Sequence, residues 1–261
     1  MGAEIGFVMR QFIKRFMPGF ALNFYRRAFR VIEDIKNARR TTEDVFGEIY
    51  KKNKWGGKRG ELNSGSGSDD DIVVPYVEML ESLSKSEGFS GLTLVDLGCG
   101  DFRVGRKILP LCRTYIGVDI VRPVVDRNNR LYGTDSTKFV HLNIIDDTLP
   151  DGDVCTIRQV LQHLSNDQIV RIVGKLEKYK WVIITEHHPS DGGDIILNVD
   201  KPHGGGIRAD FNSGVYLLAA PFNLPADNVR EVLQVPARAR SDGKDAGVIK
   251  TFLYKPRAAW V

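Results

Sequence analysis

A short stretch of the chain has the spacing of a nucleotide-binding turn. The apolar run Val95–Asp96–Leu97 ends in Gly98–Cys99–Gly100, and a segment with helical pattern follows from Arg103. Glycines let the backbone turn tightly and approach a ligand closely, and a helix that begins there points its amide groups at that ligand. Because the third glycine is Gly105, the spacing departs from the dinucleotide fingerprint of dehydrogenases.

Two acids complete this pattern. Asp96 stands two residues before the first glycine of the turn, where it can order the loop and meet a cationic ligand. Asp119 ends the next predicted strand, and a carboxylate at that place can accept hydrogen bonds from both hydroxyls of a ribose. An aspartate at a strand end is also a common helix cap, but the register of Asp119 with the glycine turn favours ligand binding.

Residues that could act as a general base follow the fourth and fifth predicted strands. His163 lies just past one strand, and Glu186, His187 and His188 follow the other. The carboxyl ends of parallel strands form the edge at which ligands bind, and histidine has the pKa of a base that works near neutral pH. We take His163 as the leading candidate and the other three residues as a second cluster. The alternative for His163 is a helix-end residue bonded to backbone.

A long Gly-rich segment after this cluster carries further polar side chains: Asp194, Asn198, Asp200, His203 and Arg208. A loop over this edge could shape an acceptor pocket. Its histidine and carboxylates could instead hold a divalent ion that binds a sugar diol. Since no fixed ligand spacing supports a metal, we predict none.

The elements that must position these residues alternate regularly from residue 91 onward. Short apolar runs separated by helical segments predict βαβ units and a parallel sheet. The predicted strands are Leu92–Leu97, Tyr115–Ile120, Lys138–Ile144, Asp153–Ile157 and Trp181–Thr185, and the predicted helices are Arg103–Leu111, Arg122–Leu131 and Asn166–Tyr179. Val229–Val235 and Lys250–Tyr254 are joined by a polar loop and predict a hairpin that closes the sheet edge.

Residues 41–90 are predicted to form a helical lid with a loop of glycine and serine. One helix begins after Thr41, its N-cap, and a second spans Asp69 to about Lys85. Between them lie Trp55 and the loop Ser64–Ser68. Such a loop is often a flexible linker, but one with a tryptophan and hydroxyls directly before a helix can close over a ligand. We expect it to cover the cofactor or the acceptor.

The first forty residues form a basic extension rich in phenylalanine, and Pro18–Gly19 splits it into two helical pieces. Its apolar face can pack on the domain or on a second subunit, giving a homo-oligomer. It can also lie on an anionic membrane surface as a peripheral contact. Both interpretations stay open.

The composition is that of an ordinary globular protein, with 42% hydrophobic and 27% charged residues and a net charge of +4. The three cysteines form no CxxC pair, which disfavours a disulfide framework or a zinc knuckle and favours a cytoplasmic location. No apolar run is long enough for a transmembrane helix.

The motifs together resemble those of class I S-adenosylmethionine-dependent methyltransferases. Val95–Gly100 looks like their motif I, Asp119 matches their ribose-binding acid, and Leu142–Pro150 resembles the stretch that flanks the adenine. Cys155–Ser165 is similar to their motif IV. The resemblance implies a Rossmann-like α/β fold, with a seven-stranded, mostly parallel sheet and a reversed C-terminal strand, here preceded by an N-terminal helical extension. We divide the chain into the extension 1–40, the lid 41–90 and the methyltransferase domain 91–261.

A narrower resemblance concerns Phe46, Tyr50, Trp55–Gly56, the Ser64–Ser68 loop and Pro221–Pro225. These are similar to bacterial methyltransferases of saccharides and natural products. Many relatives have Asp in place of Asn143, whose amide can still meet an adenine edge. The resemblances imply that S-adenosylmethionine is the cofactor, leaving as S-adenosylhomocysteine. The residues implied to bind it are Trp55, Ser66, Asp96, Gly98, Cys99, Gly100, Arg103, Asp119, Ile120, Asn143, Ile144, Arg158 and Gln159.

The function that this pattern favours is methyl transfer to a hydroxyl of a saccharide or another small molecule. One alternative is methylation of a lipid or lipid-linked glycan at the membrane surface, with residues 1–40 as the anchor. Another is a non-catalytic interaction module, which would not need the intact glycine turn and Asp119. A nucleic-acid partner is not expected. The Pro-Pro-aromatic tetrad of base methylation is missing, Ile157–Arg158–Gln159–Val160 stands in its place, and no appended basic domain is found.

Overall fold

The computed structural model describes residues 35–57, 61–190, 194–238 and 246–256. The chain divides into two compact units, residues 1–40 and 41–261. The extension predicted for residues 1–40 therefore lies almost wholly outside the described residues. The lid segment 41–90 belongs to the same compact unit as the sheet.

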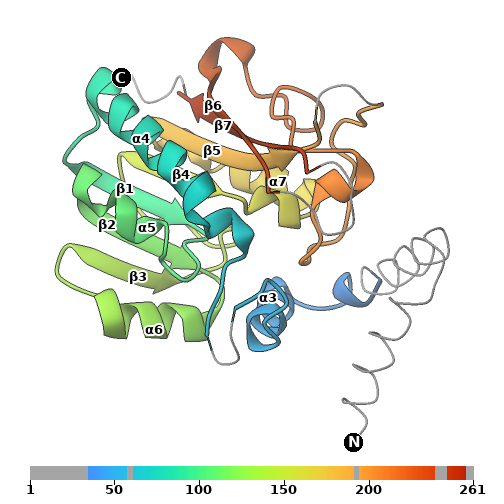
Figure 1. The fold of residues 1–261 in the computed structure, drawn as a ribbon, viewed down its shortest axis with the longest axis horizontal. Helices are drawn as coiled ribbons and strands as arrows, with labels where there is room; N and C mark the ends of the chain where they lie inside the picture. Colours follow the sequence, from blue (N-terminus) through green and yellow to red (C-terminus); the bar gives the residue numbers. More distant parts are fainter. Residues whose placement is uncertain (1–34, 58–60, 191–193, 239–245, 257–261) are drawn as a thin grey trace, which may run out of the picture. The chain divides into compact units, whose positions relative to one another are not determined.

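Seven strands form one sheet in the order β3-β2-β1-β4-β5-β7-β6 (Figure 1). The first five are parallel, and β7 pairs antiparallel with both β5 and β6. This confirms the predicted fold with its reversed C-terminal strand and hairpin. The strands are β1 Leu92–Leu97, β2 Cys112–Asp119, β3 Thr137–His141, β4 Val154–Arg158, β5 Trp181–His188, β6 Val229–Pro236 and β7 Val248–Tyr254.

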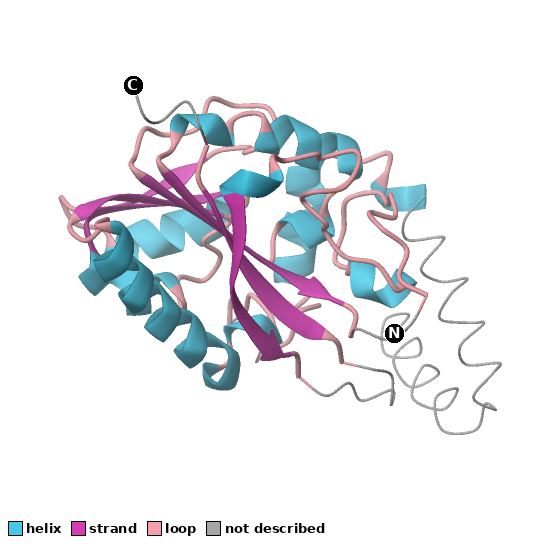
Figure 2. Cartoon of the chain, turned by 90° about the horizontal axis from the view of Figure 1, so that it is seen from above, coloured by secondary structure: helices cyan, strands magenta, loops and turns pink. Residues whose placement is uncertain are grey.

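Helices lie on both sides of the sheet (Figure 2). The α-helices of the second unit are α3 Thr42–Lys51, α4 Asp70–Glu87, α5 Gly105–Ile108, α6 Arg122–Tyr132 and α7 Asn166–Val173. The predicted cap of α3 is confirmed, because the Thr41 side chain accepts a hydrogen bond from the amide of Asp44 at 3.1 Å. Ser165 begins α7 with a capping box.

The strand sequences are almost continuously apolar because both faces of the sheet are covered. On β5, Val182 and Ile184 join a core cluster with α3 and α7, while Ile183 joins a second cluster with α4. Successive side chains of a strand point to opposite faces, so each central strand serves both clusters. Burying one such aliphatic side chain contributes roughly 1.5–3 kcal/mol to the free energy of unfolding. Because both faces of the sheet are buried in this way, the sheet is a rigid support for the loops at its edge.

Two predicted helices are shorter than expected. The segment Arg103–Leu111 is helical only over Gly105–Ile108, and a 3-10 turn carries Pro110. Proline has no amide hydrogen for the next helical bond, which accounts for the early end. Helix α7 stops at Val173 before Gly174, and a separate 3-10 turn follows.

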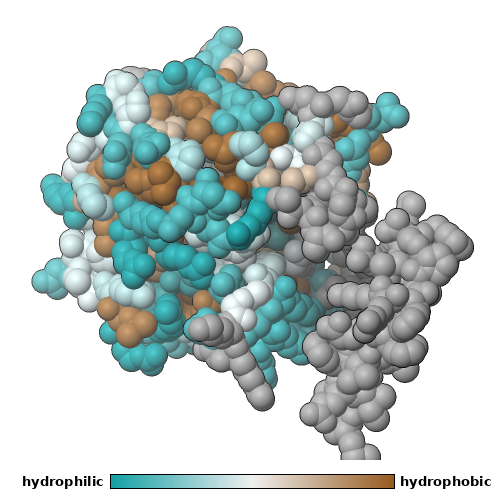
Figure 3. Space-filling model, viewed as in Figure 1, coloured by the Kyte–Doolittle hydropathy of each residue, from teal (hydrophilic) through white to brown (hydrophobic). Residues whose placement is uncertain are grey.

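On the face seen in Figure 3, apolar and polar residues are interspersed. Large exposed apolar side chains within the segment that follows β5 are Ile196, Leu197 and Leu218. Among the described residues, no helix has both the length and the apolar character needed to cross a membrane.

Candidate active site

A cavity of about 610 Å³ opens at the carboxyl ends of β1, β2, β4 and β5. Strand order reverses between β1 and β4, and open α/β sheets bind ligands in the crevice at such a switch point. Twelve of the thirteen residues predicted to bind the cofactor line this cavity: Trp55, Ser66, Asp96, Gly98, Cys99, Gly100, Asp119, Ile120, Asn143, Ile144, Arg158 and Gln159.

The glycine turn needs both of its glycines. Gly98 and Gly100 have φ values of +81° and +55°, which L side chains rarely adopt. A Cβ on Gly98 would lie 2.4 Å from the side chain of Val160, and one on Gly100 would lie 2.3 Å from Oγ of Ser64. The turn is therefore packed closely between motif IV and the Gly/Ser loop.

Asp96 organises the strands behind this turn. Its Oδ2 accepts a 2.5 Å hydrogen bond from Tyr115 and its Oδ1 a 2.7 Å bond from Thr156. Burial raises the pKa of this carboxyl, while both hydroxyl bonds and the nearby Arg158 guanidinium oppose the rise. Both oxygens thus tie β1 to β2 and β4, which supports the expected role in ordering the turn.

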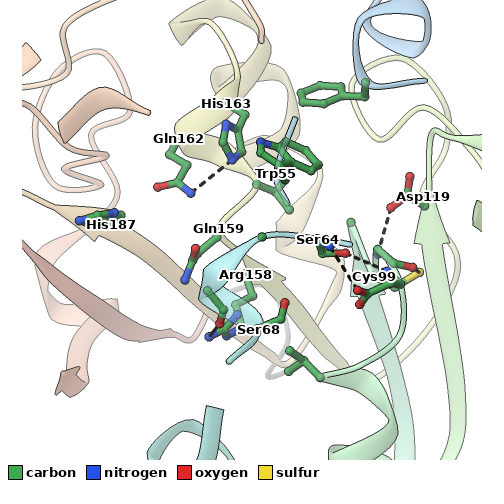
Figure 4. A pocket seen from close by; sticks show the side chains of 18 of the residues that line it. Trp55, Ser64, Ser68, Cys99, Asp119, Arg158, Gln159, Gln162, His163 and His187 are labelled. Atoms are coloured by element: carbon green, nitrogen blue, oxygen red, sulfur yellow. Dashed lines mark hydrogen bonds between the residues drawn. The ribbon is translucent and has the colours of Figure 1, made fainter. Parts of the chain in front are cut away.

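Asp119 joins the end of β2 to the glycine turn. Its Oδ2 accepts a hydrogen bond from the amide of Gly100 at 3.0 Å, and its Oδ1 accepts one from the amide of Val121 at 2.9 Å (Figure 4). Burial raises the pKa of Asp119 to about 6, against these two bonds, which lower it. Each carboxylate oxygen has lone pairs for more than one hydrogen bond, so a ribose diol can add to this arrangement.

The Asn143 side chain is engaged in its own turn. Its Oδ1 accepts a hydrogen bond from the amide of Ile145 at 3.0 Å, and its Nδ2 donates to Asp146 at 2.7 Å. This turn ends β3 at His141, earlier than the predicted Ile144. Ile144, which the resemblance places beside the adenine, lines the cavity.

The Gly/Ser loop is fastened over the turn. Ser64 and Asp101 exchange two hydrogen bonds: the amide of Asp101 donates to Ser64 Oγ at 2.9 Å, and the amide of Ser64 donates to Asp101 Oδ2 at 3.2 Å. Tyr50 Oη lies 3.1 Å from Ser64 Oγ, and Arg158 Nη2 donates to Gly67 O at 2.6 Å. The loop thus touches both the motif I turn and β4.

Arg103 was predicted to bind the cofactor, but the described structure directs it elsewhere. It does not line the cavity, and its Nη2 pairs with Asp101 Oδ2 at 3.0 Å. Asp101 also accepts the Arg103 amide at 3.1 Å. Arg103 therefore closes a local turn and supports the acid that holds Ser64.

His163 lines the cavity beside Trp55, with 5.3 Å between the ring centroids. Its Nδ1 lies 3.1 Å from the carbonyl oxygen of Gly204, so Nδ1 holds the proton and Nε2 the lone pair. The amide Nε2 of Gln162 lies 3.4 Å from that lone pair (Figure 4). Burial and the nearby Lys201 ammonium lower the pKa of His163 to about 3, so the ring is neutral at physiological pH.

The second predicted cluster is divided by strand alternation, because β5 continues to His188 instead of ending at Thr185. His187 lines the cavity, and its Nε2 donates to Ala246 O at 2.6 Å. Glu186 is buried and accepts the amides of Val160, Leu161 and Gln162 at 2.8–3.2 Å. His188 packs against Tyr216 and Phe252. Neither Glu186 nor His188 lines the cavity, so neither is placed to act as the base.

Glu186 instead holds the 3-10 turn Leu161–His163 in place. Burial raises its pKa to about 8, although the three amide hydrogen bonds and the Arg208 guanidinium lower it. The turn that carries Gln162 and His163 therefore depends on a carboxyl group beneath it.

The segment after β5 encloses the far end of the cavity. Arg208 is fully buried and donates to the carbonyl oxygens of Leu164, at 2.7 Å, and Val199. Asn198 donates to Tyr216 O and Ala220 O at 3.0 Å and 2.8 Å. Within the described residues, no three His, Cys, Asp or Glu side chains are grouped as a metal site. These polar side chains instead shape the segment that brings Gly205 and Ile207 to the cavity.

A family profile described as a methyltransferase domain matches residues 95–177. The search of curated proteins gives no match. Among solved structures, N-methyltransferase NodS from Bradyrhizobium japonicum WM9, bound to S-adenosylhomocysteine, matches with a TM-score of 0.51 and 14% identity. The match covers 74% of this chain and 93% of that protein.

A second similar structure is 1,6-didemethyltoxoflavin-N1-methyltransferase from Burkholderia thailandensis, with bound 1,6-didemethyltoxoflavin and S-adenosylhomocysteine. Its TM-score is 0.51 at 13% identity, over 82% of this chain and 87% of that one. At such identities the two structures establish the fold alone.

Residues 95–177 of this chain thus match a methyltransferase domain, and the fold around them is that of these two structures.

Several residues that line the cavity were not among the predicted site residues. They are Thr42, Phe46, Tyr50, Ser64, Tyr76, Asp101, Gln162 and Gly205, among others. Asp101 directly follows the motif I glycines, and this position alone could have predicted that it lines the cavity. Gln162 stands beside His163 in motif IV and could have been predicted in the same way. Tyr76 and Gly205 reach the cavity only through the fold.

Proposed function

We propose that this enzyme transfers the methyl group of S-adenosylmethionine to a hydroxyl of a saccharide or another small molecule. The observation that carries the proposal is one continuous cavity that runs from Asp119 and the glycine turn to His163 and His187. At its second end the lining is aromatic and amide-rich, which suits an uncharged polar ligand. The toxoflavin enzyme named above holds a small-molecule acceptor in the same fold, which supports the small-molecule part of this proposal, although that enzyme is an N-methyltransferase.

The residues present fit the cofactor. Asp119 would accept the ribose hydroxyls, Ile144 would flank the adenine, and the glycine turn would admit the cofactor close to the backbone. Arg158 is a buried guanidinium whose Nε has no partner among the described residues, so it can meet an anionic group such as the cofactor carboxylate. The Ser64–Ser68 loop would cover the cofactor in the fastened position described above.

Methyl transfer is an in-line displacement, and the main contribution of the protein to such a reaction is to align the acceptor oxygen with the methyl group. When bound, S-adenosylmethionine supplies a methyl group on a positively charged sulfur, which keeps the C–S electron pair as the O–CH3 bond forms. The hydroxyl proton then goes to a base at this edge, for which His163 Nε2 is our leading candidate and His187 the second. A neutral imidazole is the form that can take a proton, and burial keeps His163 in that form. An incoming hydroxyl would have to displace the Gln162 amide from Nε2.

The proposal is tested with S-adenosylmethionine that carries a ¹³C-labelled methyl group. The purified protein is incubated with a panel of saccharides and hydroxylated small molecules, and NMR distinguishes labelled O-methyl from labelled N-methyl products. We expect O-methyl products that are lost in Asp119→Ala. A labelled product confined to amines would contradict the hydroxyl assignment, and the absence of any product together with a failure to bind S-adenosylhomocysteine would contradict the function as a whole.

A further inference from the structure

Two amide atoms at the acceptor end of the cavity have no hydrogen-bond partner among the described residues. They are Oε1 of Gln162 and Nε2 of Gln159, and both are shielded from water. Both side chains line the cavity, and Gln162 is only 2% exposed. Because buried polar atoms are almost always paired, two unpaired atoms in one cavity indicate contacts that a ligand completes.

The orientation of the Gln162 amide follows from His163. The ring of His163 presents a lone pair on Nε2, because its Nδ1 donates to Gly204 O. Only the N–H side of an amide can face a lone pair, and Nε2 of Gln162 lies 3.4 Å from Nε2 of His163 (Figure 4). Oε1 of Gln162 is therefore the atom left for the ligand, and it is a hydrogen-bond acceptor.

Gln159 offers the opposite half of a hydrogen-bonding pair. The backbone of Gln159 has a φ of +55°, and its backbone N–H donates to Thr185 O at 2.7 Å. Its side-chain amide lies against Gly67, where a Cβ would stand 2.2 Å from Oε1 of Gln159. Glycine at this point of the loop leaves room for the amide, whose unpaired Nε2 is a donor.

We propose that Gln162 and Gln159 select an uncharged hydroxyl as the methylated group, in preference to an amine. The inference rests on the proposed function, which it makes more specific. Before transfer, a hydroxyl can donate its hydrogen to Gln162 Oε1 and accept from Gln159 Nε2 with one lone pair, and its second lone pair remains for the methyl group. The Gln162 amide must then leave Nε2 of His163, so that this nitrogen takes the hydroxyl proton as the O–CH3 bond forms. A neutral amine has a single lone pair, which the transfer requires. An amine therefore leaves the Gln159 donor unpaired, and a site built to hydrogen-bond one ligand strongly rejects another that leaves its groups unpaired.

The test compares Gln162→Met and Gln159→Met with the wild-type protein. Methionine keeps the length of the side chain and removes its hydrogen bonds. Gln234→Met is the matched control, because Gln234 is exposed on the edge strand β6. The probes are p-nitrophenyl hexosides, each paired with the corresponding aminohexoside. Saturation-transfer NMR measures probe binding to protein saturated with S-adenosylhomocysteine, and the ¹³C-methyl label reports transfer.

We expect hexosides to bind and to be labelled on oxygen. Each active-site variant should lose roughly tenfold or more in both readouts, while the affinity of Gln162→Met for S-adenosylhomocysteine stays at the wild-type value. Gln234→Met should behave as wild type. Labelling of the amino nitrogen, unchanged binding in Gln162→Met, or faster transfer in that variant because His163 Nε2 is uncovered would each overturn the inference. So would a failure of every hexoside to bind.

These outcomes separate the inference from the proposed function. A protein that binds S-adenosylhomocysteine and methylates amines keeps its methyltransferase activity and refutes only the hydroxyl selection. A protein that does not bind S-adenosylhomocysteine at all refutes both.

Discussion

Ser64 and Asp101 are joined by two reciprocal hydrogen bonds, of 2.9 Å and 3.2 Å, which fasten the Gly/Ser loop to the motif I turn. Ser64→Ala removes the acceptor of one bond and the Oγ that meets Tyr50 Oη. We expect hydrogen exchange in residues 61–68 to rise and S-adenosylhomocysteine to dissociate roughly tenfold faster, since about 1.4 kcal/mol corresponds to a factor of ten. Exposed Ser90→Ala is the control. If hydrogen exchange in the loop is the same in both variants, the hydrogen bonds of Ser64 do not hold the loop in place.

Cofactor affinity should fall as the pH is lowered through the pKa of Asp119. Burial raises that pKa to about 6, so the carboxylate loses its charge as the pH drops from about 7 to about 5. The protonated form is a poorer acceptor for ribose hydroxyls, and the affinity for S-adenosylhomocysteine therefore decreases toward acid pH. Calorimetric titration across this range measures the effect. Asp119→Asn should bind weakly with little pH dependence, and an equally steep pH dependence in that variant would assign the titration to another group.

Glu186→Gln should destabilise the fold. The carboxyl oxygens accept three amides of the turn that carries His163, and an amide nitrogen in their place would face a backbone N–H. Leaving a buried donor unpaired costs about 1–3 kcal/mol in the free energy of unfolding. Urea denaturation measures this loss. Glu231→Gln is the comparison, because the exposed Glu231 lies 3.7 Å from the half-buried Lys250 near the sheet edge, and such a surface pair contributes about 1 kcal/mol or less. Equal stabilities of the two variants would show that Glu186 does not support the turn.

His163→Ala should keep cofactor affinity and lower turnover by about 10²-fold, the low end for a positioned base. The low end applies because burial lowers the pKa of His163 to about 3, which makes it a weak base. For the same reason, turnover should not fall as the pH is lowered through 6.5, where an ordinary histidine becomes protonated. Normal turnover in His163→Ala, with loss in His187→Ala, would move the role to β5. If both variants are fully active, transfer proceeds by alignment alone.

The sheet and the cofactor side were largely predictable from the sequence. Alternating apolar and helical segments predicted the parallel strands, and the glycine turn followed by Asp119 predicted the position of the cavity. These features are local, because a turn and a strand end impose residue types within a few positions. Arg103 shows the limit of such inference. Its position next to motif I suggested a contact with the cofactor, but its guanidinium pairs with the neighbouring Asp101 carboxylate instead.

The acceptor side was less predictable because it is built by segments that are distant in the sequence. The length of β5 decided which residues face the cavity, and a strand end is among the least certain features of a sequence-based prediction. With β5 extended to His188, alternation directs His187 into the cavity and Glu186 beneath the motif IV turn. The pairing of Gln162 with His163 and the approach of Gly204 likewise depend on the folded segment after β5.

The most direct test of the account is calorimetric titration of the full-length protein with S-adenosylhomocysteine, repeated with Asp119→Ala. We expect one molecule to bind per chain and the Asp119→Ala variant to bind at least tenfold more weakly, because the variant loses the acceptor of the ribose hydroxyls. Thermal unfolding of the ligand-free variant confirms that it is folded. Tight binding of NAD with no binding of S-adenosylhomocysteine, or identical affinities in the wild-type and variant proteins, would contradict the assignment of this cavity.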